Sequence, residues 1–131
     1  MSDWRRRWHG RVRTAEALAA IVAATLVAWA VPPRHWNRFK PAGGSAATLA
    51  DIAPRAAAIR RAERRLGREA RCLPRALALI LMLRRRSLVA DLVIGGPQQA
   101  GSPVDLHAWI ELDGTRVFGE RDVPDRAMFR F

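Results

Sequence analysis

The chain has 131 residues, half of them hydrophobic, a formal net charge of +11 and a single cysteine. The length fits one domain, the hydrophobic content excludes a chain disordered by composition, and one cysteine excludes an intramolecular disulfide or a cysteine-rich zinc site. The charge favours an acidic macromolecular partner, although no DNA- or RNA-binding motif accompanies it.

Residues 1–47 are expected to form an N-terminal helical region. Thr14 is a candidate N-cap, so we predict a helix from there to about Ala30, ending before the proline pair at 32–33. The uncharged stretch 17–31 would reach only ~22 Å, short of a ~30 Å hydrocarbon core. A buried or interfacial helix is therefore favoured over a membrane span. Arginines and tryptophans flank the stretch and leave peripheral membrane contact open.

Residues 48–131 are expected to form the core of the same domain. A loop at 37–45 leads to a second helix, predicted from Thr48 or Asp51 to Leu66 and ended by Gly67. A third helix, from about 73 to 86, is the most apolar. It is therefore predicted to be central and buried on several sides.

The pattern then changes to short β-rich runs at 88–94, 104–112 and 115–118. Asp113-Gly114 between the last two is a signal for a two-residue hairpin. Helices followed by a small antiparallel sheet predict an α+β fold for residues 1–131, a single domain.

The only cysteine, Cys72, stands at the start of the central helix. Pro74 supports this placement because proline is favoured in a first helical turn. At a helix start, unpaired N–H groups and the helix dipole stabilise an anion, and the thiolate is the reactive form of cysteine. Cys72 is thus a candidate nucleophile, although a lone cysteine is more often a small buried hydrophobe.

His107, in the predicted strand 104–112, is the candidate base for Cys72. A lone strand histidine is usually structural, but a helix-start cysteine followed by a strand histidine is the pattern of a Cys–His pair. The neighbouring Trp109 shares its strand face and either lines the cleft or, more commonly for a tryptophan, fills the core.

The imidazole of such a pair works best when an acceptor holds its far nitrogen. Counting outward from the hairpin places Glu120 opposite His107, and a bulge near Gly119 would bring in Asp122 instead. Asp105 is a weaker third option. The alternative is that these acids are solvated groups in a polar turn.

Two stretches resemble a known family: Cys72-Leu-Pro-Arg-Ala-Leu-Ala-Leu79 and His107-Ala-Trp-Ile-Glu-Leu-Asp-Gly114. Together with Leu92-Val-Ile-Gly-Gly96, they closely resemble the stand-alone leader peptidases of lasso-peptide biosynthesis. These enzymes form a transglutaminase-like family typified by the C-terminal domain of McjB. The resemblance is strong from about residue 61 to 120 and only general before that.

The resemblance implies a papain-like cysteine protease, with residues 48–131 as a transglutaminase-like catalytic core. Cys72 and His107 match the family's nucleophile and base, whereas the segment with Glu120 and Asp122 departs from its usual acidic step. The implied substrate is the leader region of a ribosomally made lasso precursor, cleaved before macrolactam closure. The implied partners are a separate leader-recognition protein and a lasso cyclase. The implied location is the cytoplasm, and no cofactor, metal or nucleic acid is required.

Two other functions remain open from the residues. One is a basic helical adaptor for nucleic acid or an anionic membrane, which would lose binding steeply with added salt. The other is acyl transfer, since transglutaminase-like sites can pass an acyl group to an amine as well as to water.

Overall fold

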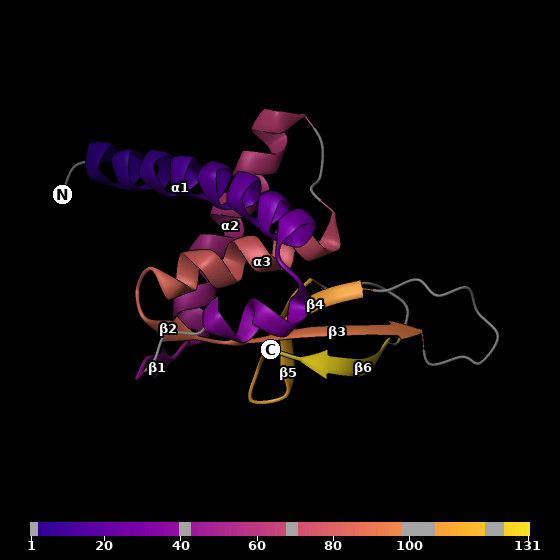
Figure 1. Ribbon diagram of the computed structural model, residues 1–131. Helices are drawn as coiled ribbons and strands as arrows, with labels where there is room; N and C mark the ends of the chain where they lie inside the picture. Colours follow the sequence, from indigo (N-terminus) through magenta and orange to yellow (C-terminus); the bar gives the residue numbers. More distant parts are fainter. Residues whose placement is uncertain (1–2, 40–42, 68–70, 98–106, 120–124) are drawn as a thin grey trace.

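The computed structural model describes residues 3–39, 43–67, 71–97, 107–119 and 125–131 (Figure 1). The elements in chain order are α1 (Asp3–Ala30), the 3-10 helix η1 (Pro33–Phe39), β1 (Ser45–Ala46), α2 (Leu49–Leu66), α3 (Cys72–Arg84), β2 (Leu88–Val89), β3 (Asp91–Pro97), β4 (His107–Leu112), β5 (Thr115–Phe118) and β6 (Asp125–Arg130). Helices precede the sheet, which confirms the predicted α+β class.

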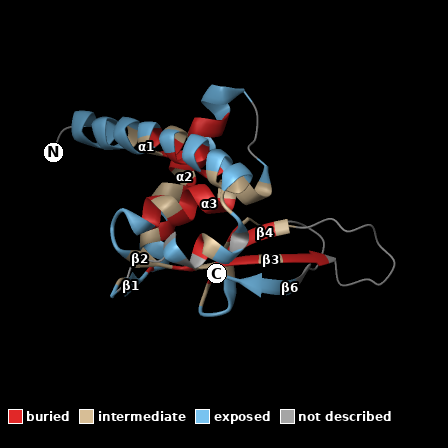
Figure 2. Ribbon diagram, in the orientation of Figure 1, coloured by how far each residue is buried: buried red, intermediate tan, exposed pale blue. Residues whose placement is uncertain are grey.

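The central helix α3 lies between the other helices and the sheet (Figure 1). It packs on α1 and α2 on one side and on β3 and β4 on the other. Most of its side chains are accordingly buried (Figure 2), namely Ala76, Leu77, Ala78, Leu79, Ile80, Met82 and Leu83. The prediction of a central apolar helix is confirmed.

The helix α1 is longer than predicted, and the proposed N-cap role of Thr14 is wrong. The helix begins at Asp3, an acid in its first turn, and continues through the arginine-rich segment. The Thr14 hydroxyl donates to the carbonyl of Gly10, 2.8 Å away, as a side chain inside a helix does. The segment predicted as a loop from residue 37 begins inside η1, which runs to Phe39.

The second helix has the predicted bounds because both of its ends are capped. Thr48 is the N-cap, and its hydroxyl and amide exchange hydrogen bonds with Asp51 in a capping box. At the other end Gly67 has a φ of 72°, the left-handed conformation that ends helices at glycine.

The four-stranded sheet is antiparallel, in the order β5-β4-β3-β6, and a short parallel pair of β1 and β2 lies apart from it. The Asp113-Gly114 turn is confirmed, with Leu112 paired to Thr115. Beyond the turn the register shifts, so that Ile110 pairs with Phe118 instead of Val117. The straight count on which the placement of Glu120 rested is therefore off by one residue at Phe118, and Glu120 itself lies outside the described residues. Strand β6 was not predicted.

Candidate active site

Cys72 is the first residue of α3, as predicted, and its side chain is half-buried. Arg71 occupies the N-cap position in an extended conformation, and its side chain makes no capping hydrogen bond. Helix geometry gives first-turn N–H groups no intrahelical acceptor, so this helix start can offer donors to an anion. That is the environment expected for a thiolate or for the oxyanion of an attacked carbonyl.

Arg75 fixes the start of α3 to its surroundings. It follows Cys72 by three residues, so the two share a helix face. Its Nε donates to Glu63 Oε1 on α2 at 3.0 Å, and that carboxylate is buried. Its guanidinium also lies 5.0 Å from the ring centroid of Phe118 at the end of β5. One arginine thus ties the cysteine-bearing turn to α2 and to the sheet.

His107 is the first residue of β4, and its ring is held by a backbone oxygen. Nε2 lies 2.6 Å from the carbonyl oxygen of Gly119. A carbonyl only accepts, so Nε2 must carry a proton in this contact. In the neutral ring, Nδ1 then has the lone pair, which makes it the nitrogen able to take a proton.

Gly119, which the sequence suggested only as the place of a bulge, can be replaced by no other residue without strain. Its φ is 86°, and a Cβ there would lie 3.0 Å from the Ala108 oxygen and 3.1 Å from Trp109 Cα. Those are backbone atoms of β4, which cannot turn aside as a flexible side chain can. Its sequence signal was a glycine directly after a predicted strand, opposite the histidine strand.

The other residues on the His107 face of β4 form a charged and aromatic row. The rings of His107 and Trp109 are 5.9 Å apart and nearly parallel. Trp109 is buried, and its Nε1 donates to Glu111 Oε1 at 2.8 Å. The Arg116 guanidinium covers the tryptophan at 4.1 Å from the ring centroid. Trp109 therefore packs against the His107 ring and limits the movement of the imidazole.

Glu111 completes the row with a hydrogen bond from Arg130 of β6. Burial pushes the pKa of Glu111 upward, but the hydrogen bonds from Trp109 and Arg130, with the charges of Arg130 and Arg116, outweigh it. The net result is a pKa below the usual value for a glutamate. This carboxylate is thus ionised at neutral pH and supports the sheet beneath the histidine.

Two contacts lead from the cysteine-bearing turn toward the strand that holds the histidine. Arg75 reaches Phe118, and the next residue, Gly119, holds His107. Within the part of the chain that the structure describes, no hydrogen bond joins the thiol to the imidazole. In β4, Ala108 and Ile110 face the main core. Successive side chains of a strand point to opposite faces, so His107 lies on the face of β4 that is turned away from α3. A Cys72–His107 pair would therefore form around the end of β4.

The three acidic candidates for the orienting group, Glu120, Asp122 and Asp105, all lie outside the described residues. Among the described residues, the acceptor at the histidine is the Gly119 carbonyl, adjacent in sequence to Glu120. Among the residues with described positions, no cluster of three or more His, Cys, Asp or Glu side chains could hold a metal ion.

Cys72 lies at the start of a central helix that packs on a small antiparallel sheet, and His107 lies at one end of a strand of that sheet. The model of the transglutaminase-like superfamily matches residues 6–130. No curated protein and no solved structure matches the chain. Members of this superfamily are often cysteine proteases or transferases, and an activity of either type fits the chain. Because the match covers nearly its whole length, the chain belongs to the transglutaminase-like superfamily.

Proposed function

We propose that this protein is a cysteine peptidase with Cys72 as the nucleophile and His107 as the base. The observation that supports this most directly is the His107–Gly119 contact of 2.6 Å. With Nε2 bound to this carbonyl, Nδ1 is the ring nitrogen that can accept a proton. The superfamily to which the chain belongs also includes cysteine proteases.

In the proposed reaction, the His107 ring takes the Cys72 thiol proton, and the thiolate attacks the scissile carbonyl. The carbonyl oxygen becomes an oxyanion, which the N–H donors at the start of α3 stabilise. The C–N bond then breaks, and the imidazolium returns its proton to the leaving amine. Water, deprotonated by the same ring, attacks the thioester and releases the carboxylic acid and the thiol.

Gly119 would orient the imidazole during this cycle through its carbonyl oxygen. Glu120, the next residue, would add a carboxylate that stabilises the imidazolium, with Asp122 as the alternative. Glu120→Gln and Asp122→Asn should therefore give clearly different losses of activity, because in this proposal only one of the two acids would contact the ring. Equal, mild losses would mean that the Gly119 carbonyl orients His107 without an acid.

The proposed substrate is the leader region of a lasso-peptide precursor, on the strength of the Cys72–Leu79 and His107–Gly114 segments. The peptidase would free the core N-terminus before a separate cyclase closes the macrolactam. A separate leader-recognition protein would deliver the substrate, in the cytoplasm.

The test is to incubate the protein with a synthetic precursor peptide read from the neighbouring reading frames, with and without the accompanying recognition protein. Mass spectrometry should detect one cut at the leader–core junction. Cys72→Ala should abolish it, and His107→Gln should slow it by about 10²- to 10⁴-fold, the typical contribution of a general base. Cleavage by Cys72→Ala at the wild-type rate would refute the nucleophile assignment.

Acyl transfer is the second candidate, because transferases are also found in the superfamily. The same experiment separates the two when an amine such as glycine ethyl ester is added. Peptidase activity gives the free acid, whereas a transferase gives a product heavier by the condensed amine.

A further inference from the structure

The outer side of α1 carries an unusual concentration of exposed apolar side chains. Among the described residues, ten large hydrophobic side chains are exposed, and six of them belong to α1. These six are Trp4, Trp8, Val12, Val22, Leu26 and Trp29, which we call the outer stripe. At 3.6 residues per turn they fall on one side of the helix, within an arc of about 100°. Trp29 is 90% exposed, the largest value among them.

The opposite side of α1 is the one that packs on α2 and α3. Its buried residues are Thr14, Ala17, Ala20, Ile21 and Ala24. Most of α1 is coloured as exposed in Figure 2, with buried residues in its middle, and the helix lies on the side of α3 remote from the sheet. The domain therefore has no described element that covers the outer stripe.

Arginines flank the outer stripe in the N-terminal half of α1, beside Trp4 and Trp8. Arg5, Arg7 and Arg11 are exposed on the same turns, and the Arg5 guanidinium lies 5.5 Å from the ring centroid of Trp4. Positive side chains beside exposed tryptophans suit the boundary between an anionic lipid headgroup layer and its acyl chains.

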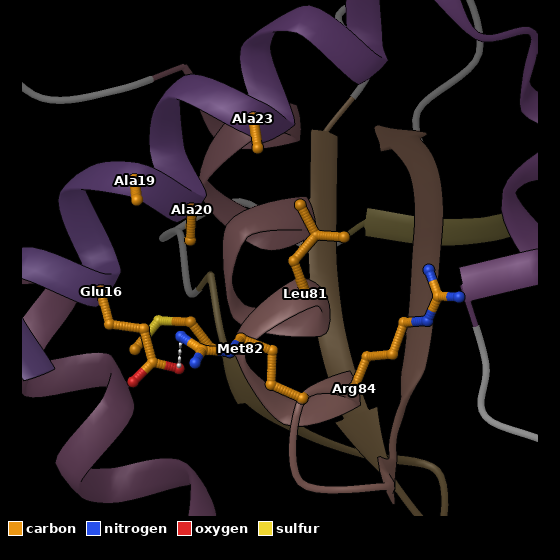
Figure 3. Close-up of a pocket in the computed structure, with 8 residues that line it drawn as sticks. Glu16, Ala19, Ala20, Ala23, Leu81, Met82 and Arg84 are labelled. Atoms are coloured by element: carbon orange, nitrogen blue, oxygen red, sulfur yellow. Dashed lines mark ion pairs between the residues drawn. The ribbon is translucent and has the colours of Figure 1, made fainter.

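The apolar surface continues from the stripe into an open hollow of about 430 Å³ between α1 and α3 (Figure 3). Ala19, Ala20 and Ala23 of α1 face Leu81 and Met82 of α3 across it. The exposed Arg84 and Arg85 line its edge, and Arg85 pairs with Glu16 at 3.6 Å. A second helix thus adds both apolar surface and arginines to the same region.

We propose that the outer stripe docks the protein on an anionic bilayer, with α1 lying in the plane of the interface. By length and composition α1 also resembles a membrane-spanning helix, a test that core helices and signal sequences pass too. Its inner side packs on α2 and α3, so lipid cannot surround it while the domain is folded. The net charge of +11 favours an anionic surface over a second copy of the same chain.

The test measures binding of the full chain to vesicles of phosphatidylcholine alone or mixed with phosphatidylglycerol. Trp36 and Trp109 are buried, so a blue shift of tryptophan fluorescence on binding would report Trp4, Trp8 and Trp29. We expect a shift and co-sedimentation only with the anionic vesicles, both weakened by salt.

Two variants address the two components of the surface. Trp4→Ser/Trp8→Ser should weaken binding by about tenfold or more because apolar burial is lost. Arg5→Gln/Arg7→Gln/Arg11→Gln should weaken it by about fivefold for each arginine. Leu49→Ser/Leu66→Ser is the matched control, since these exposed leucines belong to α2 and lie outside the stripe. It should bind like the wild type.

Equal binding by wild type and both stripe variants would overturn the proposal, as would no binding to anionic vesicles. A concentration-dependent dimer, seen by light scattering and lost in Trp4→Ser/Trp8→Ser, would overturn it in favour of self-association. Circular dichroism checks folding, and the arginine variant, with changes only at exposed side chains, keeps the test valid if the tryptophan variant unfolds. None of these measurements depends on peptidase activity.

Discussion

Gly119 combines a left-handed backbone with close approach to β4, and the two effects can be separated by substitution. Gly119→Ala should lower the free energy of unfolding by about 2–4 kcal/mol, from backbone strain and the contact with Ala108 and Trp109. Gly114→Ala is the matched control because its φ of 79° is similar but nothing lies within 4 Å of its Cβ position. It should cost only about 1–2 kcal/mol. Denaturant unfolding measures both values.

The same substitution should move the carbonyl that holds His107. Gly119→Ala should then reduce kcat for peptide cleavage and change the pH–rate profile, whereas Gly114→Ala should leave both unaltered. Equal losses of stability and identical profiles in the two variants would mean that the close contact with β4 has no role in positioning the ring.

At the level of single residues, sequence patterns predicted that Cys72 begins a helix and that His107 lies in a strand, but not which groups hold them. Cys72 could be placed because Pro74 and the apolar run mark a helix start. The Gly119 contact could not be predicted, since the one-residue register shift after Glu111 depends on how β5 packs. Arg75 was likewise missed because Glu63 and Phe118 are distant in sequence.

Among the elements, the start of α3 should depend strongly on the Arg75–Glu63 ion pair. The Glu63 side chain is only 5% exposed, so Arg75→Met would leave a buried carboxylate without this partner. We expect a loss of about 2–4 kcal/mol in unfolding free energy. Arg85→Met is the control, because the Arg85 side chain is 71% exposed in its 3.6 Å pair with Glu16, and such a pair should be worth less than about 1 kcal/mol. Similar losses in both variants would contradict the anchoring role of Arg75.

The capping box at the N-terminus of α2 should also contribute measurably to stability. Thr48→Ala should destabilise the fold by about 1 kcal/mol, since the N-terminal amides of α2 lose an acceptor. Thr25→Ala in α1 is the control; that hydroxyl bonds the Ile21 carbonyl inside a helix, where alanine is favoured. Thermal unfolding should therefore distinguish the two, and a loss in Thr25→Ala as large as in Thr48→Ala would count against the capping role.

The Thr48 amide and hydroxyl also lower the pKa of Asp51. The pKa of Asp51 is lower in the folded than in the unfolded state, so the ionised carboxylate stabilises the fold at pH values above its unfolded pKa. This stabilisation is lost as the pH falls through the folded pKa. The deficit of Thr48→Ala should accordingly shrink in acid.

Helix ends were predictable where the sequence carries a true cap or a proline signal and not where a cap-like residue lies inside a helix. Thr48, Asp51 and Gly67 mark α2 in the sequence, and the structure places its ends there. The start of α1 was misplaced because Thr14 looks like a cap, whereas its hydroxyl bonds back to Gly10. Strand β6 was missed because it is defined by pairing with β3, a partner about thirty residues earlier in the chain.

For the whole molecule, Glu111 joins the strands into one unit and makes stability depend on pH. It lies in β4, accepts a hydrogen bond from Arg130 of β6 and feels the charge of Arg116 in β5. The pKa of Glu111 is lowered in the folded state, so at acid pH the unfolded chain binds more protons than the folded one. The stabilisation is complete above the unfolded pKa of a glutamate and is lost as the pH falls through the folded value.

Glu111→Gln tests this at the level of the whole fold. The difference in unfolding free energy between wild type and Glu111→Gln should be largest at neutral pH and decline in acid, because protonation removes the charge that the variant lacks. Chemical denaturation at a series of pH values measures it. Arg130→Gln should show a decline of the same sign, since it removes the other half of the contact. A difference that stays constant across the acid range would mean that the ionised carboxylate does not hold the strands together.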